Sequence, residues 1–121
     1  MSPEIVLLIL LQLKHFLIDF VYQTEKELEG KGIYGNQDGI NHSIKHAIFT
    51  GLSVLLVCGL GNVFLALTMA VLDFVFHYHI DYIKASLSCK NKDDPLFWNH
   101  LGLDQFLHQL TYISILGFTL L

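Results

Sequence analysis

Four long apolar stretches run along the chain, and each is close to the roughly 20 residues that a helix needs to cross a bilayer. The short GLGN segment at 59–62 separates the second stretch from the third. Two glycines and an asparagine favour a tight turn there, because glycine adopts positive φ at little cost. The pattern therefore predicts an all-α fold, an antiparallel four-transmembrane-helix bundle in a single domain over 1–121, with helices at about 3–23, 41–60, 62–87 and 99–121.

The composition agrees with a membrane protein. Of the 121 residues, 53% are hydrophobic and 15% are charged, which leaves little polar surface for a soluble domain of this size. The net charge of −4 provides no basic patch, so we exclude a nucleic-acid partner. The two cysteines lie in unlike surroundings and do not predict a disulfide framework or a thiolate metal site. No Lys or Arg precedes the first apolar stretch, and we expect no cleaved signal peptide.

The lysines predict an orientation. Six of the seven lie in or beside the first and third connections, namely Lys26, Lys31, Lys45, Lys84, Lys90 and Lys92. Lys14 lies deeper and must extend to the interface or join the polar interior. Neither end of the chain nor the 59–62 turn carries a Lys or Arg. Because basic residues are enriched in cytoplasmic loops, we expect a multi-pass protein with these two connections in the cytoplasm and both termini outside.

Each apolar stretch also carries two ionisable residues spaced i, i+4, which places both on one face of a helix. In each pair, the residue nearer the predicted outer end of the helix is a histidine. Counted from that end at a rise of roughly 1.5 Å per residue, the depths of these four histidines differ by at most about 6 Å. In an up-down-up-down bundle, all four pairs therefore converge on one level. The pairs are His15/Asp19, His42/His46, His77/Asp81 and Asp104/His108.

Buried carboxylates predict a metal. A charged side chain at the centre of a membrane helix costs roughly 2.5–3.5 kcal/mol, and a divalent cation would offset that cost. Imidazole and carboxylate ligands suit Zn, with Fe, Mn or Ni as alternatives. We expect one or two ions, held by the eight residues of the four pairs: His15, Asp19, His42, His46, His77, Asp81, Asp104 and His108.

A metal-dependent hydrolase is the function that this arrangement favours. A metal lowers the pKa of bound water, and a free carboxylate acts as the base, so Asp19, Asp81 and Asp104 are candidate catalytic residues. The polar residues that flank the pairs are candidate substrate-binding residues: Gln23, Lys84 and Gln105. Because the pairs lie toward the cytoplasmic leaflet, the expected substrate is a lipid or polyprenyl phosphoester. The expected partners are the lipid bilayer and this lipid phosphate, with a homo-oligomer left open.

Several other functions were considered. The pairs suit a non-enzymatic metal or proton carrier, or a structural metal-binding membrane protein. A His–Asp network without metal would fix helix packing, since membrane bundles use polar residues as interhelical contacts. A haem protein needs only two facing histidines and leaves the aspartates unexplained. A holin-like protein that perturbs membranes leaves the convergence of eight polar residues unexplained.

Several further polar residues lie near the pairs. Asp73 is one turn deeper than His77 and would either support that histidine or pair with Lys14. His79 points away from the face that carries the pair, so we expect it at the membrane interface. His100 shares a face with the last pair but lies at the cytoplasmic edge, where it is at most an auxiliary residue.

With these pairs identified, the chain resembles the domain of unknown function 3307 family of small bacterial and phage membrane proteins. The resemblance is carried by HFLIDFVYQ (15–23), HSIKH (42–46), HYHIDYIK (77–84) and DQFLH (104–108). It implies a bacterial inner (plasma) membrane location and a site made of the eight paired residues with Gln23, Lys84 and Gln105. A looser similarity to membrane-bound metal-dependent hydrolases supports the activity by analogy alone.

Overall fold

The computed structural model of the chain describes residues 1–120, and within these residues it contains helices and no strands, which confirms the all-α prediction. A π-helical turn at Leu17–Val21 continues helix α1, and a 3-10 turn at Leu60–Asn62 precedes helix α4. The α-helices are α1 (Pro3–Phe16), α2 (Glu25–Gly30), α3 (Gln37–Cys58), α4 (Val63–Leu87) and α5 (Pro95–Leu120).

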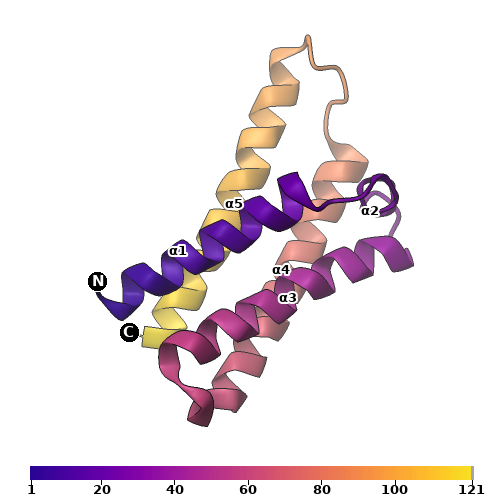
Figure 1. Cartoon of the computed structure of the whole chain (residues 1–121). Helices are drawn as coiled ribbons and strands as arrows, with labels where there is room; N and C mark the ends of the chain where they lie inside the picture. The colour runs from indigo at the N-terminus through magenta and orange to yellow at the C-terminus, as the bar shows by residue number, and fades with distance from the viewer. Residues whose placement is uncertain (121) are drawn as a thin grey trace.

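The four long helices form an antiparallel bundle in which α1 packs on α3, α3 on α4, α4 on α5, and α5 on α1. Figure 1 shows both chain ends at the same end of the bundle as the α3–α4 turn. The helices spread apart toward the other end, which carries α2 and the α4–α5 connection (Figure 1). The short helix α2 packs against α3.

Local capping sets most of the helix boundaries. Pro3 and Pro95 begin their helices, where the absent N–H is not needed. Thr24 forms a capping box with Glu27 at the start of α2. The side chain of Asn36 accepts hydrogen bonds from the first turn of α3. The helix ends at Cys58 and is followed by Gly59, whose φ is 89°.

The predicted boundaries need small corrections. The second long helix begins at residue 37 instead of 41, because Asn36 caps it. The fourth long helix, α5, begins at residue 95 instead of 99. Asp94 accepts a hydrogen bond from the Leu96 N–H (2.8 Å), and Pro95 is the first residue of the helix. Helix α2 was not predicted, since four of its six residues are charged and its single leucine forms no apolar repeat. The predicted last residue of the fourth helix, Leu121, lies outside the described residues.

The end of the bundle with the chain termini is packed with apolar side chains. The cluster contains residues from all four long helices, and they are Leu7, Leu11, Val54, Ala66, Met69, Tyr112 and Ile115. Polar side chains replace this apolar packing toward the end that carries α2. The fold thus places a polar interior between an apolar core and the α2 segment.

One helical segment, Leu60–Leu87, is long and apolar enough by itself to cross a membrane within the described residues. By this test the prediction of four membrane spans is not confirmed. Helix α1 has 14 residues before its π turn, and α3 and α5 each carry the polar residues of the predicted site.

Candidate metal centre

The polar interior is built from the four predicted pairs, one from each long helix. Helical periodicity directs both members of each pair to the inner face, and the bundle brings the four inner faces together. All eight side chains are buried: at most 9% of any of them is exposed. The structure therefore brings together every residue predicted to hold a metal.

Asp19 lies at the centre of the first group of contacts. Its Oδ1 atom lies 2.7 Å from His42 Nε2, 3.1 Å from His46 Nε2 and 3.8 Å from His77 Nε2. The Nε2 atoms of His42 and His77 are 3.3 Å apart. One potential ligand atom from each of these four residues lies within 4.8 Å of all the others. Helices α3 and α4 and the π turn therefore supply a compact set of three imidazoles and one carboxylate.

The π turn positions Asp19. In this turn the N–H of Tyr22 donates to the carbonyl of Leu17 (2.8 Å), five residues earlier, which widens the helix locally. Single π turns occur often at functional sites because they redirect side chains. Here the turn ends the helical part of the first long segment, and its buried side chains are Ile18 and Asp19.

Asp81 is the centre of a second group, adjacent to the first. Its Oδ2 atom is 3.2 Å from His77 Nε2, and its Oδ1 atom is 3.2 Å from His108 Nε2. His108 Nε2 is also 3.5 Å from Asp104 Oδ1. Asp81 thus joins α4 to α5 and connects the two groups through His77.

His15 is held mainly by α5. Its Nδ1 atom is 2.8 Å from the Tyr112 hydroxyl and its Nε2 atom is 2.9 Å from Gln105 Oε1. Nδ1 is also 3.3 Å from Asp19 Oδ2. Because an amide oxygen only accepts, Nε2 donates to Gln105, and both ring nitrogens already have partners. The sequence did not indicate Tyr112 as a partner, since it belongs to none of the i, i+4 pairs.

A buried ion pair closes the deep side of the site. Lys14 Nζ donates to Asp73 Oδ2 at 2.5 Å, and Thr50 Oγ1 donates to the same oxygen at 2.6 Å. Lys14 Nζ also lies 3.2 Å from His46 Nδ1. Of the two roles considered for Asp73, the structure shows pairing with Lys14. The pair explains how a lysine remains buried in the first long helix.

Lys31 enters the site from the side opposite the Lys14–Asp73 pair. The sequence analysis did not predict it as a site residue. Its Nζ atom is 2.9 Å from Asp81 Oδ2 and 3.5 Å from Asp19 Oδ1, and its side chain is 10% exposed. Burial by itself lowers the pKa of Lys31, but the charges of Asp81 and Asp19 outweigh burial and raise the pKa above its ordinary value. Lys31 is therefore a charged residue within the site. Helical spacing cannot predict that a loop lysine contacts the paired residues. The one feature of the sequence that marks Lys31 is the pair of glycines beside it, at positions 30 and 32.

Glu27 fixes the α2 segment to α3. It forms an ion pair with Lys45, and its Oε2 atom is 3.8 Å from His42 Nδ1. Burial raises the pKa of Glu27, but the hydrogen bonds from Lys45 and the Thr24 N–H outweigh it and lower the pKa below its ordinary range. The segment that carries Lys31 is thus held by a second ion pair.

The three predicted substrate-binding residues, Gln23, Lys84 and Gln105, line one pocket of about 80 Å³. The same pocket is lined by Lys31 and by all three predicted catalytic aspartates, Asp19, Asp81 and Asp104. Gln105 Nε2 donates to Asp104 Oδ2 (2.9 Å). Among the described residues, the buried Oε1 atom of Gln23 has no hydrogen-bond partner. The pocket forms a polar opening on the α2 side of the site.

Two other histidines lie apart from the cluster. His79 is exposed and lies 3.2 Å from the Tyr34 hydroxyl and 2.7 Å from the Val75 carbonyl. His100 Nδ1 accepts a hydrogen bond from the Cys89 N–H (2.9 Å). The structure therefore places His79 on the face predicted for it and gives His100 a structural contact in the α4–α5 connection.

Comparison with known proteins matches residues 7–121 to the family described as "Protein of unknown function (DUF3307)". No curated protein and no solved structure matches the chain. The matched range includes all four pairs and the Lys31 segment. The predicted resemblance is confirmed over nearly the whole length: this chain belongs to the DUF3307 family.

Proposed function

We propose that this protein is a membrane-embedded metal-dependent hydrolase that acts on a lipid or polyprenyl phosphoester near the cytoplasmic leaflet. The observation that carries the proposal is the set formed by Asp19, His42, His46 and His77, three of which would bind a catalytic zinc and leave its fourth position to water. Tetrahedral zinc with bonds of about 2.0–2.1 Å needs ligand atoms about 3.3 Å apart. Four of the six separations among these atoms are 2.7, 3.1, 3.3 and 3.8 Å, and one ligand atom from each residue lies within 4.8 Å of the other three.

The charge of the interior also supports one divalent cation. Four buried carboxylates, Asp19, Asp73, Asp81 and Asp104, face two buried ammonium groups, Lys14 and Lys31. Glu27 and Lys45 neutralise each other nearby. If every histidine is neutral, two negative charges remain in an interior where unpaired charge is costly. One divalent ion supplies the missing charge.

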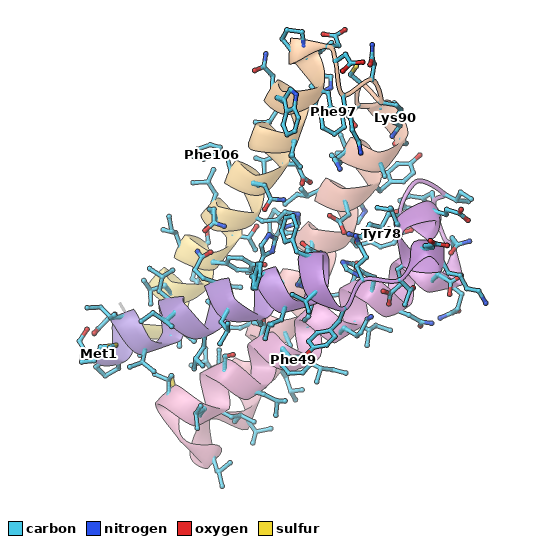
Figure 2. The ribbon with its side chains drawn as sticks, turned by 45° about the horizontal axis from the view of Figure 1, so that its top comes forward. Met1, Phe49, Tyr78, Lys90, Phe97 and Phe106 are labelled. Carbon is cyan, nitrogen blue, oxygen red and sulfur yellow. The ribbon has the colours of Figure 1, made fainter. Side chains whose placement is uncertain are left out.

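The distribution of apolar side chains supports insertion in a membrane. Within the described residues, buried polar and charged side chains outnumber buried apolar ones, while large apolar side chains are exposed on every long helix. Figure 2 shows one of them, Phe106, directed away from the bundle. A soluble protein rarely exposes such extensive apolar surface, whereas lipid favours it. The lysine-rich connections would then lie in the cytoplasm, and both termini outside.

The polar pocket provides the groups that hydrolysis of a phosphoester requires. When bound, a divalent cation lowers the pKa of water and offsets the charge of a phosphoryl group. Lys31 and Lys84 line the pocket and provide further positive charge. Asp104 lines it too, and among the described residues its Oδ1 atom accepts no hydrogen bond. In this proposal Asp104 takes the proton of the attacking water and returns it to the alcohol when the P–O bond to that alcohol breaks.

A metal or proton carrier is less well supported. Transport needs a polar route to the other end of the bundle. The route from the site meets the Lys14–Asp73 pair and then the apolar cluster that includes Leu7, Val54 and Ile115. A site that is closed at its deep side and open at the α2 side suits a substrate that enters and leaves by one opening.

Metal content tests the metal centre. Protein purified in detergent should contain about one divalent ion per chain by elemental analysis. His46→Ala should weaken metal binding by at least about 100-fold, the upper range for removing even an outer contact of a ligand. His79→Ala is the matched control, because His79 is exposed and away from the cluster. Wild-type protein without a divalent metal, or equal binding by the two variants, would contradict the proposal.

Hydrolysis tests the activity separately. Metal-loaded protein should release phosphate or alcohol from members of a panel of phospholipids and polyprenyl phosphates. Asp104→Asn should keep the metal but reduce the rate by about 10²–10⁴-fold, the usual contribution of a general base. Full metal content with no turnover on any lipid phosphoester would exclude the hydrolase and favour a structural metal site.

A further inference from the structure

Two apolar grooves follow one another along the seam between α4 and α5. The first, about 250 Å³, runs from Ser88 and His100 to Ile80 and Leu107. The second, about 300 Å³, is also lined by Ile80 and Leu107 and continues to Leu72 and Phe118. The two grooves adjoin at Ile80 and Leu107, one residue from each helix, and together they are called here the α4–α5 groove.

The α4–α5 groove adjoins the polar pocket of the candidate metal centre. Lys84 and Asp104 line both the groove and the pocket. Two other apolar grooves described in the structure, between α3 and α4 and between α1 and α3, share no lining residue with the pocket. The α4–α5 groove is therefore distinguished by its direct connection to the site.

The dimensions and polarity of this surface suit an amphiphile. From Leu87 to Leu72 the groove follows α4 for about 22 Å at roughly 1.5 Å per residue, which exceeds the depth of one leaflet of a hydrocarbon core about 30 Å thick. Its walls are mostly apolar, whereas the adjoining pocket contains Lys31, Gln23 and Gln105 beside Lys84. A long hydrocarbon chain fits the groove, and an anionic head group fits the pocket.

We infer that the α4–α5 groove binds the hydrocarbon chain of a lipid phosphate, with the phosphoryl group in the polar pocket beside Lys84. The choice of a phosphoryl head group rests on the proposed function. The chain runs from the level of Lys84 past Ile80 and Leu107 toward Phe118, away from the lysine-rich connections. This direction is that of a lipid whose head lies at the cytoplasmic surface.

Photo-crosslinking tests the groove without requiring turnover. Metal-loaded wild-type protein in phosphatidylcholine nanodiscs is exposed to hexadecyl phosphate that carries a diazirine in its chain. Crosslinks should fall on the α4 and α5 residues that line the groove. Unlabelled hexadecyl phosphate should suppress them, and hexadecyltrimethylammonium of the same chain length should not. Crosslinks spread evenly over all four long helices, or equal suppression by both competitors, would overturn the inference.

A matched pair of variants adds a second measurement. Leu107→Trp fills the groove at its midpoint, whereas Leu67→Trp adds the same side chain in the α3–α4 groove, which is about 280 Å³. Leu107→Trp should reduce crosslinking by about tenfold, equivalent to roughly 1.4 kcal/mol of binding free energy. Leu67→Trp should leave it within about twofold. Equal effects of the two variants would overturn the inference, and the wild-type crosslink map decides the question if Leu107→Trp fails to fold.

The outcome separates this inference from the proposed hydrolase. Crosslinks confined to the groove in a protein that hydrolyses no lipid phosphoester would support the groove and exclude the hydrolase. Hydrolysis accompanied by evenly spread crosslinks would support the hydrolase and exclude the groove.

Discussion

Individual carboxylates in this site contact several partners at once. Asp81 lies within 3.2 Å of Lys31, His77 and His108, which come from a loop and two helices. Asp19 likewise contacts His42 and His46. Because each carboxylate is shared, removing one cationic partner changes the balance of the whole cluster.

Lys31→Met tests the role of the loop lysine as an internal cation. Without metal, the variant should be less stable by about 3–5 kcal/mol, because the carboxylates of Asp19 and Asp81 lose a buried partner. Saturating zinc should then raise the thermal midpoint of the variant more than that of the wild type, since the metal compensates charge that Lys31 no longer offsets. Circular dichroism melting in detergent, with and without zinc, measures both effects.

Lys26→Met is the control for this substitution, because Lys26 is an exposed lysine of the same α2 segment. It should change stability by less than about 0.5 kcal/mol. An equal gain from zinc in wild type and Lys31→Met would show that Lys31 does not share the charge compensation with the metal.

The affinity for zinc should depend on pH. A ligand imidazole must be unprotonated, so protons compete with zinc and binding weakens as the pH falls. Protonation of each of the three ligand histidines can then lower the affinity for zinc by up to about tenfold per pH unit. Competition with a chromophoric chelator between about pH 8 and 5 measures this slope, and a flat profile would contradict an imidazole-based site.

At the level of elements, each long helix supplies one pair, and the segment from α2 to Lys31 closes the site. This segment depends on a close backbone contact between the end of α2 and the start of α3. A Cβ atom on Gly39 would lie 2.9 Å from the Gly30 carbonyl oxygen, and one on Gly30 would lie 3.0 Å from the Gly39 nitrogen. Both positions therefore require glycine for packing.

Gly39→Ala should displace the α2 segment, because the new methyl group meets backbone atoms that cannot move alone. We expect a loss of about 1–3 kcal/mol in stability, typical of overpacking. Faster hydrogen exchange over residues 24–36 would show that the segment has loosened. Gly102→Ala in α5 is the control, since a Cβ there meets no atom within 4 Å. Similar exchange over residues 24–36 in both variants would contradict the role assigned to this contact.

At the scale of the whole molecule, the bundle reverses the usual arrangement of a soluble domain. Its interior at the site is ionic, and its surface is largely carbon, as the outer side chains in Figure 2 show. Lipid accepts such a surface, and the helical backbone satisfies its own hydrogen bonds there. In the proposed membrane location, the lysines in the connections would lie at the cytoplasmic end.

Cysteine labelling tests this orientation. In a background with Cys58→Ser and Cys89→Ser, a reporter is introduced either as Gly61→Cys in the α3–α4 turn or as Asp93→Cys in the α4–α5 connection. Both positions are exposed. A membrane-impermeant maleimide should label Gly61→Cys in right-side-out vesicles and Asp93→Cys in inverted ones. Labelling of both reporters from the same side, or release of the protein from vesicles without detergent, would contradict a four-span bundle.

The sequence alone determined which side chains share a helix face. The i, i+4 spacing of His15 and Asp19, and of the three other pairs, follows from helical geometry and needs no knowledge of packing. The antiparallel order followed from short connections, so the convergence of eight residues was predictable. The sequence analysis gave Asp73 two possible roles, and pairing with Lys14 was one of them.

Tertiary structure decided which groups touch. The contact of Lys31 with Asp81, the hydrogen bond between Tyr112 and His15, and the π turn at Asp19 depend on loop path, helix crossing and local widening of a helix. These features involve residues far apart in sequence, and helical periodicity does not constrain them. Local spacing therefore fixed the chemistry on each helix, whereas packing fixed the geometry between helices.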